Sequence, residues 1–396
     1  MYYYNSWIAK TERIDSVSFE IKEYIAQNMP SVFQTLRELC AIPAPSNHEE
    51  QRANYCKTWL ENIGARGVYM DSALNVVFPL NCENKKDITV FVAHTDTVFP
   101  DTEPLPYVED ENVIRCPGVG DDTVSVAVLL HVARYYVEQN IVPSNGVLFV
   151  LNSGEEGLGN LKGTRQIFEE YKDCIAQFVS FDGQIDMVND ECAGSHRYSV
   201  TVRTTGGHSF QDFGKANAIV ELSKIITELN KISVPQKQGT RTTFNIGTVS
   251  GGTSVNTIAQ GATMLCEYRS TDWECLEYMK AHFAKVFSAA QTEEVSVEVT
   301  QVGDRPCSRI DIQKQAGFRD KVLPLLKELV GSSVYCKSAS TDCNIPLSLG
   351  IPALCLGVYR GGGMHTREEW LEKASVPLGM EIALKTALLL TSKEVL

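Results

Sequence analysis

Histidine and carboxylate side chains recur at the ends of apolar, strand-like runs in this 396-residue sequence. They are His94 and Asp96 in HTDTV, Asp121 and Asp122 in GVGDDT, Glu155 and Glu156 in NSGEEG, Asp182 in SFDGQ, and His365 in GGGMHTREE. Taken one at a time, such groups are usually turns, helix caps or solvated loop residues. Together they follow predicted strands or glycine-bearing turns of one α/β region, which is where open α/β sheets bind ligands.

This set of side chains has the composition of a metal site. Two imidazoles and a surplus of carboxylates suit zinc, or with less selectivity manganese or cobalt, and the set contains no thiolate. A single catalytic zinc needs three protein ligands, whereas this set offers more groups than one ion can use. The sequence therefore predicts two ions, about 3.5–4 Å apart, that share one bridging carboxylate.

Two pairs of neighbours are expected to divide their roles. Adjacent glutamates in an extended chain point to opposite sides, so one of Glu155 and Glu156 is expected to bind metal while the other carries a proton. His94 and Asp96 face the same side, and a carboxylate behind the ring is the usual support for a ligating histidine.

The elements around these groups predict an α/β fold. Apolar residues with helical spacing cover 18–42, 49–64 and 121–140, whereas 88–96 and 145–153 have the composition of buried strands. Helices that alternate with such strands indicate a sheet covered on both faces. The same style returns after residue 306, with a helix over 314–331 and a strand within 352–360.

The pattern changes between residues 194 and 305. Its elements follow the order βαββαβ, which is that of a ferredoxin-like unit with an antiparallel sheet. The expected elements are strand 196–206, helix 217–230, strands 242–252 and 262–270, helix 273–290 and strand 294–303. The chain is therefore expected to form one large domain from 1–193 and 306–396, with a small domain, 194–305, inserted into it.

Composition narrows the possible partners and the compartment. The formal net charge of -13, with no basic run, disfavours nucleic-acid and anionic-membrane surfaces. No signal peptide is recognisable and no apolar stretch approaches the ~20 residues of a bilayer span, so the protein is expected to be cytoplasmic. The twelve cysteines are scattered without a CxxC pair, which favours free buried thiols over disulfides or a zinc knuckle.

With these motifs in this order, the sequence resembles the co-catalytic zinc hydrolase family that contains peptidase T (tripeptide aminopeptidase), bacterial glutamate carboxypeptidase, cytosolic dipeptidases and aminoacylases. The resemblance covers nearly the whole chain and implies a zinc-peptidase-like mixed sheet covered by helices, with an inserted lid and dimerisation domain. It also implies roles for seven residues: His94 and Asp182 as ligands of one zinc, Glu156 and His365 as ligands of the other, Asp121 as the bridge, Glu155 as the general base, and Asp96 as the support of His94.

The same resemblance extends to the inserted domain and to one glycine run. In GGHSF, His208 matches the lid histidine that reaches the substrate carbonyl, often from the partner subunit of a homodimer. Asn256 in SVNTIA and Arg269 in CEYRS match lid residues that hold a substrate carboxylate, for which a guanidinium is well shaped. Gly362 and Gly363, in the run that begins at Gly361, would let backbone amides approach a substrate.

The branch of the family is less clear from the sequence. Residues 123–125, Thr-Val-Ser, stand where the family commonly has Lys-Gly or a similar run of small residues. Asp182 in FDG, where aminoacylases have glutamate, and STDCN at 340–344 resemble the peptidase T branch. The expected activity is therefore an aminopeptidase that cleaves short peptides, tripeptides best. The alternatives are a dipeptidase or carboxypeptidase, then an N-acyl amino acid deacylase, and last a non-catalytic binding protein.

Overall fold

The computed structural model of the protein describes residues 2–331 and 333–392, and their side chains except those of 2–18 and 158. Two compact units form within it. The first comprises Met1–Asp190, Ile310–Lys337 and Thr341–Leu396, and the second comprises Glu191–Arg309 and Ser338–Ser340. The expected boundaries, at 194 and 305, fall close to these divisions. Residues 1, 332 and 393–396, assigned to the large domain, lie outside the described residues.

An eight-stranded mixed sheet forms the centre of the first unit. Its order is β1-β2-β6-β3-β7-β16-β8-β15. The bounds are β1 (Tyr69–Met70), β2 (Val76–Leu80), β3 (Ile88–His94), β6 (Val147–Asn152), β7 (Ile175–Phe181), β8 (Met187–Cys192), β15 (Tyr335–Ala339) and β16 (Ala353–Leu356). The four central strands run parallel, and β2 and β8 pair with them antiparallel. Parallel strands buried on both faces need continuous apolar runs, and every residue of β3 and β6 is buried.

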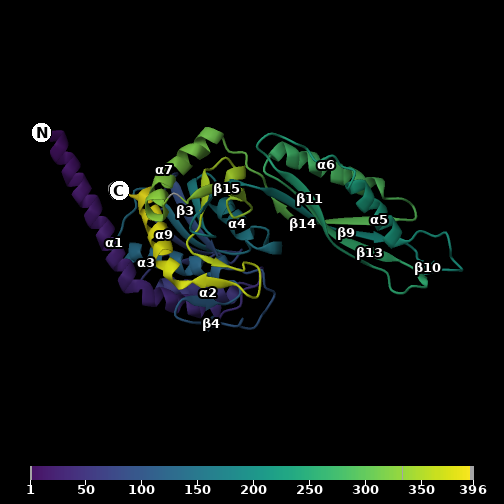
Figure 1. Ribbon diagram of the computed structural model, residues 1–396, viewed down its shortest axis with the longest axis horizontal. Helices are drawn as coiled ribbons and strands as arrows, with labels where there is room; N and C mark the ends of the chain where they lie inside the picture. Colours follow the sequence, from purple (N-terminus) through teal and green to yellow (C-terminus); the bar gives the residue numbers. More distant parts are fainter. Residues whose placement is uncertain (1, 332, 393–396) are drawn as a thin grey trace. The chain divides into compact units, whose positions relative to one another are not determined.

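Helices cover this sheet, as the sequence predicts. They are α1 (Tyr2–Cys40), α2 (Glu50–Asn62), α3 (Val124–Glu138), α4 (Lys162–Glu170), α7 (Ile312–Val330), α8 (Asn344–Ser348) and α9 (Val376–Thr391). Helices α1, α3 and α9 pack against one another (Figure 1). The mixed α/β fold expected from the sequence is thus confirmed.

The expectation that no apolar stretch approaches the length of a bilayer span is wrong for one segment. The 19 residues Lys373–Thr391 are long and apolar enough to cross a bilayer by length and composition alone. However, 78% of an 18-residue window of this stretch is buried inside the protein, as in a core helix. Helix α9 owes its apolar composition to packing on all sides, against α1, α3, α7 and the sheet.

A small sheet connects two loops of the first unit. Its order is β17-β18-β5-β4, with bounds β4 (Val108–Glu109), β5 (Val113–Arg115), β17 (Gly361–Gly362) and β18 (Trp370–Glu372). Strand β5 leads into a tight, kinked turn, Val119–Thr123, and β17 and β18 form a hairpin. Antiparallel pairing of β18 with β5 therefore joins the hairpin to the strand that precedes this turn.

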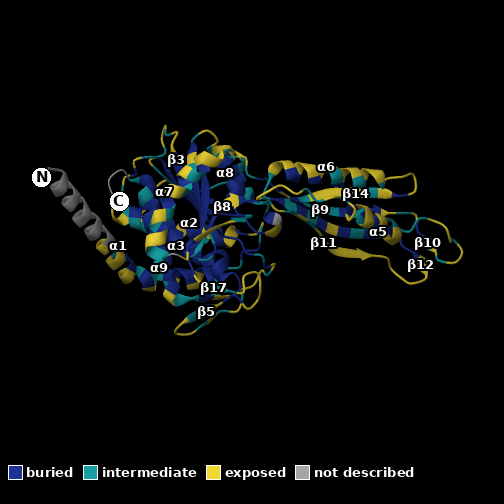
Figure 2. Cartoon of the chain, turned by 45° about the horizontal axis from the view of Figure 1, so that its top comes forward, coloured by how far each residue is buried: buried dark blue, intermediate teal, exposed yellow. Residues whose placement is uncertain are grey.

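The second unit has the predicted βαββαβ order. Its elements are β9 (Gly194–Arg203), α5 (Ala218–Leu229), β11 (Thr242–Gly251), β13 (Gly261–Ser270), α6 (Trp273–Ala289) and β14 (Ser296–Arg305), with a short ribbon of β10 (Gly207–His208) and β12 (Thr257–Ile258). The sheet order β11-β13-β9-β14 is antiparallel throughout. Helices α5 and α6 lie on one face of the sheet, with exposed residues along their outer sides (Figure 2).

The cysteines behave as the sequence predicts. All twelve are free thiols, and most are buried; Cys336 is exposed, and Cys82 and Cys174 are partly buried. They therefore act mainly as small apolar side chains in the packing of the two units.

Candidate metal centre and active site

Three neighbouring strands bring their carboxyl ends to the same edge of the large sheet. His94 is the last residue of β3, Asp182 follows β7 directly, and Glu155 and Glu156 follow β6. Because β6, β3 and β7 are adjacent and parallel, these side chains converge. Asp121 comes to the same place from the kinked turn Val119–Thr123.

Asp121 lies between two histidines. Its Oδ1 is 3.1 Å from Nε2 of His94, and its Oδ2 is 3.0 Å from Nε2 of His365. The same nitrogen of His365 is 3.0 Å from Oε1 of Glu156. One carboxylate thus faces two imidazoles with separate oxygens, which is the arrangement expected of a bridging ligand.

Further carboxylates complete two groups around Asp121. In each group, ligand atoms of three residues lie within 4.8 Å of one another. The first group is His94, Asp121 and Asp182, and the second is Asp121, Glu156 and His365. The structure therefore brings together all five residues to which the family resemblance gives a metal, and a third such group, of His94, Glu155 and Glu156, links the two.

The electrostatics of this cluster favour a cation. Burial and the neighbouring charge of Asp121 raise the pKa of Asp182 to about 7. Burial also raises the pKa of Glu156. Hydrogen bonds to Asp121 and Glu156 raise the pKa of His365 to about 10. Several carboxylates packed out of water repel one another, and a divalent cation would relieve that repulsion, so the nitrogen and oxygen donors present fit the metals that the sequence predicts.

Asp96 does more than support His94. Nδ1 of the His94 ring is 3.1 Å from the carbonyl oxygen of Asp96 and 3.5 Å from its Oδ1. The carboxylate of Asp96 accepts the backbone N–H groups of Glu155 and Glu156, each at 2.9 Å, and the hydroxyl of Ser46 at 2.6 Å. Asp96 therefore fixes the loop that carries both glutamates as well as the imidazole ring.

The two glutamates do not point to opposite sides, as extended chain would require. Carboxylate oxygens of Glu155 and Glu156 lie within 4.8 Å of each other and of a His94 nitrogen. Both residues are buried. The reason is the local backbone: β6 ends at Asn152, and Gly154 has a φ of +64°, so the chain turns here. The two glutamates differ in their contacts, because Glu156 also contacts His365.

Sequence reasoning assigned no role to a deeper layer of carboxylates. Asp122 is fully buried and accepts the backbone N–H of His94 at 3.0 Å. Asp342, also fully buried, accepts the hydroxyl of Thr164 at 2.5 Å and the side-chain amide of Asn152 at 2.8 Å. The motif STDCN was noted only as a resemblance. No local pattern shows that its aspartate lies beneath the metal ligands.

The glycine run and residues 123–125 have structural contacts that the sequence does not show. Gly361 and Gly362 form β17, and Gly363, with a φ of +72°, turns the chain toward His365. Thr123 donates a 2.6 Å hydrogen bond to the carbonyl oxygen of Gly118 within the turn that holds Asp121. Contact of Gly362 and Gly363 with a substrate stays a prediction.

The three predicted lid residues lie in the second unit and fall into two places. His208 and Asn256 lie together at the ribbon of β10 and β12. There the N–H of Ser209 donates to the carbonyl oxygen of Asn256 at 3.1 Å. Arg269 pairs with Ser195, where β9 begins, whereas Gly261, beside the ribbon, pairs with Arg203. Eight residues of β-strand separate these two pairs, a span of about 25 Å.

This separation limits how the two residues could act together. Within one chain, Asn256 and Arg269 cannot hold the same carboxylate, because they lie at opposite ends of the sheet. The guanidinium of Arg269 is also engaged already, by two hydrogen bonds to Glu267 at 2.8 and 3.0 Å. Sequence pattern placed each residue on its strand but did not provide the register that separates them.

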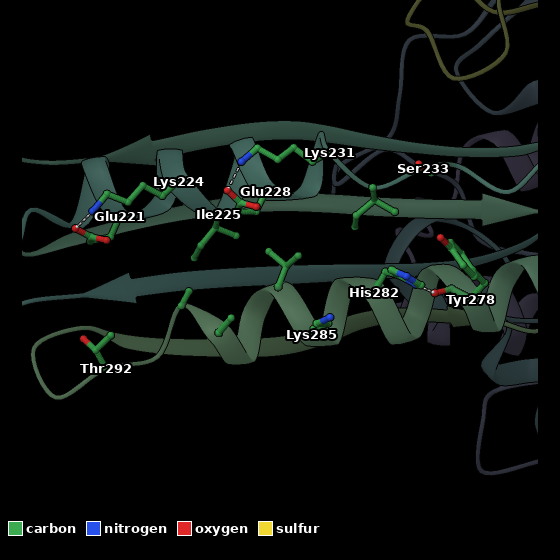
Figure 3. A pocket seen from close by; sticks show the side chains of 14 residues that line it. Glu221, Lys224, Ile225, Glu228, Lys231, Ser233, Tyr278, His282, Lys285 and Thr292 are labelled. Carbon is green, nitrogen blue, oxygen red and sulfur yellow. Dashed lines mark hydrogen bonds and ion pairs between the residues drawn. The ribbon is translucent and has the colours of Figure 1, made fainter.

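A groove of about 720 Å³ lies between α5 and α6 in the second unit (Figure 3). Ile225 and Val286 contribute apolar walls, and Lys224, Lys231 and Lys285 lie at its rim. None of its lining residues belongs to the histidine and carboxylate groups described above. The groove therefore does not have the chemistry of the metal centre.

Comparison with known proteins agrees with this geometry. Residues 90–389 match the peptidase family M20/M25/M40, and the chain belongs to this family. The family resemblance predicted from the sequence is thereby confirmed.

Individual relatives are distant. A putative succinyl-diaminopimelate desuccinylase DapE of Mycobacterium tuberculosis is 24% identical over 352 residues, which cover 87% of this chain and 94% of the relative. A tripeptidase (SAV1512) from Staphylococcus aureus superposes with a TM-score of 0.70 at 23% identity, covering 90% and 97% of the two chains. The aminopeptidase PepT from Bacillus cereus gives a TM-score of 0.69 at 20% identity, covering 92% and 99%. At these identities the two structures establish the shared fold.

Proposed function

We propose that this protein is a two-metal peptidase that removes the amino-terminal residue of short peptides, tripeptides best, with zinc as the metal and cobalt or manganese as substitutes. The observation that carries the proposal is Asp121, whose two oxygens face His94 and His365 separately. A carboxylate in this position serves two ions at once, and the remaining carboxylates divide between them.

The residues around the proposed ions have distinct tasks. His94 and Asp182 would hold one ion, Glu156 and His365 the other, and Asp121 both. When bound, two divalent cations would polarise an amide carbonyl and lower the pKa of a water molecule at the site. Asp96 keeps the His94 ring and the glutamate loop in place through its four contacts.

Glu155 is the proposed general base. Its carboxylate lies within 4.8 Å of ligand atoms of His94 and Glu156, and its backbone N–H is fixed by Asp96. A carboxylate held beside the cluster can take the proton of the attacking water and then pass it to the leaving amine. This double use of one carboxyl group suits hydrolysis of an unactivated amide.

The lid residues fit a homodimer. The ring nitrogen Nδ1 of exposed His208 faces the N–H groups of Phe210 and Gln211, at 3.3 and 3.4 Å, which leaves Nε2 for another partner. About 25 Å of β-strand separates His208 and Asn256 from Arg269. The three side chains of one subunit therefore cannot all contact the same small peptide. We therefore propose that Arg269 acts in its own subunit's site, whereas His208 and Asn256 act in the partner's.

The structural relatives and the sequence relative favour different substrates. The structural relatives named above include a tripeptidase and an aminopeptidase, which favours short peptides with a free amine. The sequence relative is named a desuccinylase, so the second candidate is an N-acyl amino acid deacylase. Both reactions hydrolyse an amide of a small substrate that carries a carboxylate, and the same metal centre could serve either.

A substrate panel on metal-replete protein separates these candidates. It contains free tripeptides, dipeptides, tripeptides with an acetylated amine or amidated carboxylate, and N-acetyl and N-succinyl amino acids. We expect the free tripeptides to react fastest and to release their amino-terminal residue. Faster hydrolysis of the N-acyl amino acids would establish a deacylase, and release of the carboxy-terminal residue would establish a carboxypeptidase.

A further inference from the structure

Glu369 is a buried carboxylate that binds the backbone of the loop carrying Asp121. Its Oε2 accepts the N–H of Gly118 at 2.6 Å, and its Oε1 accepts the N–H groups of Gly120 and Asp121, each at 2.9 Å. The residue is 1% exposed. Each of these hydrogen bonds to the Glu369 carboxyl group comes from a backbone amide of the turn. Convergent N–H groups of a turn form a recognised site for an anion.

The turn packs closely against neighbouring side chains. Gly118 has a φ of +78°, and a Cβ there would lie 2.7 Å from the side chain of Thr97. A Cβ at Gly120 would lie 2.5 Å from the ring of Tyr359. The two glycines therefore allow a close approach of backbone to its surroundings, and the carboxyl group of Glu369 fills the concave side of the turn.

The segment that carries Glu369 also carries His365. Both lie in the stretch from β17 to β18, and Trp370, next to Glu369, pairs with Arg115 of β5. The backbone carbonyl of Glu369 accepts the N–H of Cys116 at 3.2 Å. One short segment thus sets the position of His365 and of the loop that presents Asp121, and these two side chains meet at 3.0 Å.

We propose that Glu369 is a positioning residue, which holds the backbone of Gly118–Asp121 so that the Asp121 carboxylate faces His94 and His365 together. The inference rests on the proposed two-metal site. Metal geometry tolerates displacements of only about 0.5 Å in its ligands, so a small shift of this turn weakens both sites. Glu369 itself touches no reacting atom.

Metal affinity measures this role without any peptide substrate. Metal-free wild type, Glu369→Gln, Glu369→Ala and the control Glu368→Gln are titrated with Co²⁺ against a chromophoric chelator, with thermal unfolding of each metal-free protein recorded. Glu368 is the exposed neighbour in the same segment, so its variant controls for loss of one charge. We expect Glu369→Gln to bind Co²⁺ at least ~10-fold more weakly, as is usual for residues that orient metal ligands, and Glu368→Gln to match the wild type.

Chemical rescue by formate distinguishes a positioning role of Glu369 from a general effect on stability. In Glu369→Ala, formate can occupy the vacated amide cluster, so we expect added formate to restore Co²⁺ affinity in a saturable way, with no effect on the wild type. Wild-type affinity in Glu369→Gln would overturn the proposal, and this isosteric variant decides the matter if Glu369→Ala does not fold. Absence of Co²⁺ binding by the wild type would instead overturn the proposed two-metal function.

Discussion

Nε2 of His365 lies 3.0 Å from Oδ2 of Asp121, although the two residues come from separate loops of the chain. A β-ladder between β18 and β5 joins these loops, so their meeting is built into the fold. The other oxygen of Asp121 faces His94. From this relationship follow a shared carboxylate, two ion sites and the predictions below.

Glu155→Gln should separate metal binding from catalysis. The substitution preserves shape but removes the group that accepts and returns the proton. We expect two bound ions per chain and a turnover number at least ~100-fold lower, the usual scale of general acid–base catalysis. Metal content by elemental analysis and tripeptide hydrolysis are measured on the same sample. Near-normal turnover, or loss of an ion, would show that Glu155 has another role.

Asp182→Asn should change how stability depends on pH in the metal-free protein. The pKa of Asp182 is raised from its ordinary value of 3.8 to about 7 in the folded state, mainly by burial. A raised carboxyl pKa gives stability that is present below pH 4 and is lost as pH rises through 7. We expect the variant to gain melting temperature relative to the wild type between pH 4.5 and 7.5. An unchanged difference across this range would contradict the assigned environment.

His208→Ala and Glu155→Gln should complement each other if the lid histidine serves the partner's site. Each variant alone is expected to be nearly inactive. In a heterodimer, one site combines an intact Glu155 with an intact His208 from the other chain, so a randomly exchanged mixture should regain up to about a quarter of wild-type activity. Proven subunit exchange without recovery, or a monomer by light scattering, would remove the cross-subunit role.

Arg269→Ala tests whether the arginine acts in its own subunit. Loss of a charge-assisted pair worth about 1.5–3 kcal/mol should lower kcat/KM more than ~10-fold. Mixed with His208→Ala, it should regain activity, because one site of the heterodimer then has its own Arg269 and the partner's His208. If both residues acted across the interface, that heterodimer would contain no intact site and the mixture would stay inactive.

The metal-site residues could be predicted because each follows a strand or a glycine turn. His94, Glu155, Glu156 and Asp182 follow β3, β6 and β7, whose parallel order places their ends together. The fold class was equally accessible, since buried parallel strands and amphipathic helices leave clear patterns. These features depend on local sequence and on general rules of sheet assembly.

Other features depend on contacts that no local pattern reveals. Glu369 acts through backbone amides far away in sequence, and the register of β9 and β13 decides that Arg269 lies far from Asn256. The turn at Gly154 brings the side chains of Glu155 and Glu156 to the same side, although adjacent side chains of an extended chain face opposite sides. In each case, tertiary structure determines what the side chain reaches.

The most direct test of the two-metal site is a titration of metal-free protein with Zn²⁺ or Co²⁺, with bound metal and tripeptide hydrolysis followed together. We predict two ions per chain in the wild type and no hydrolysis without them. Asp182→Asn and Glu156→Gln should each lose one ion, whereas Asp121→Ala, folded by circular dichroism, should lose both. Full hydrolysis by protein shown to be metal-free, or two tightly bound ions in Asp121→Ala, would contradict the shared-carboxylate site.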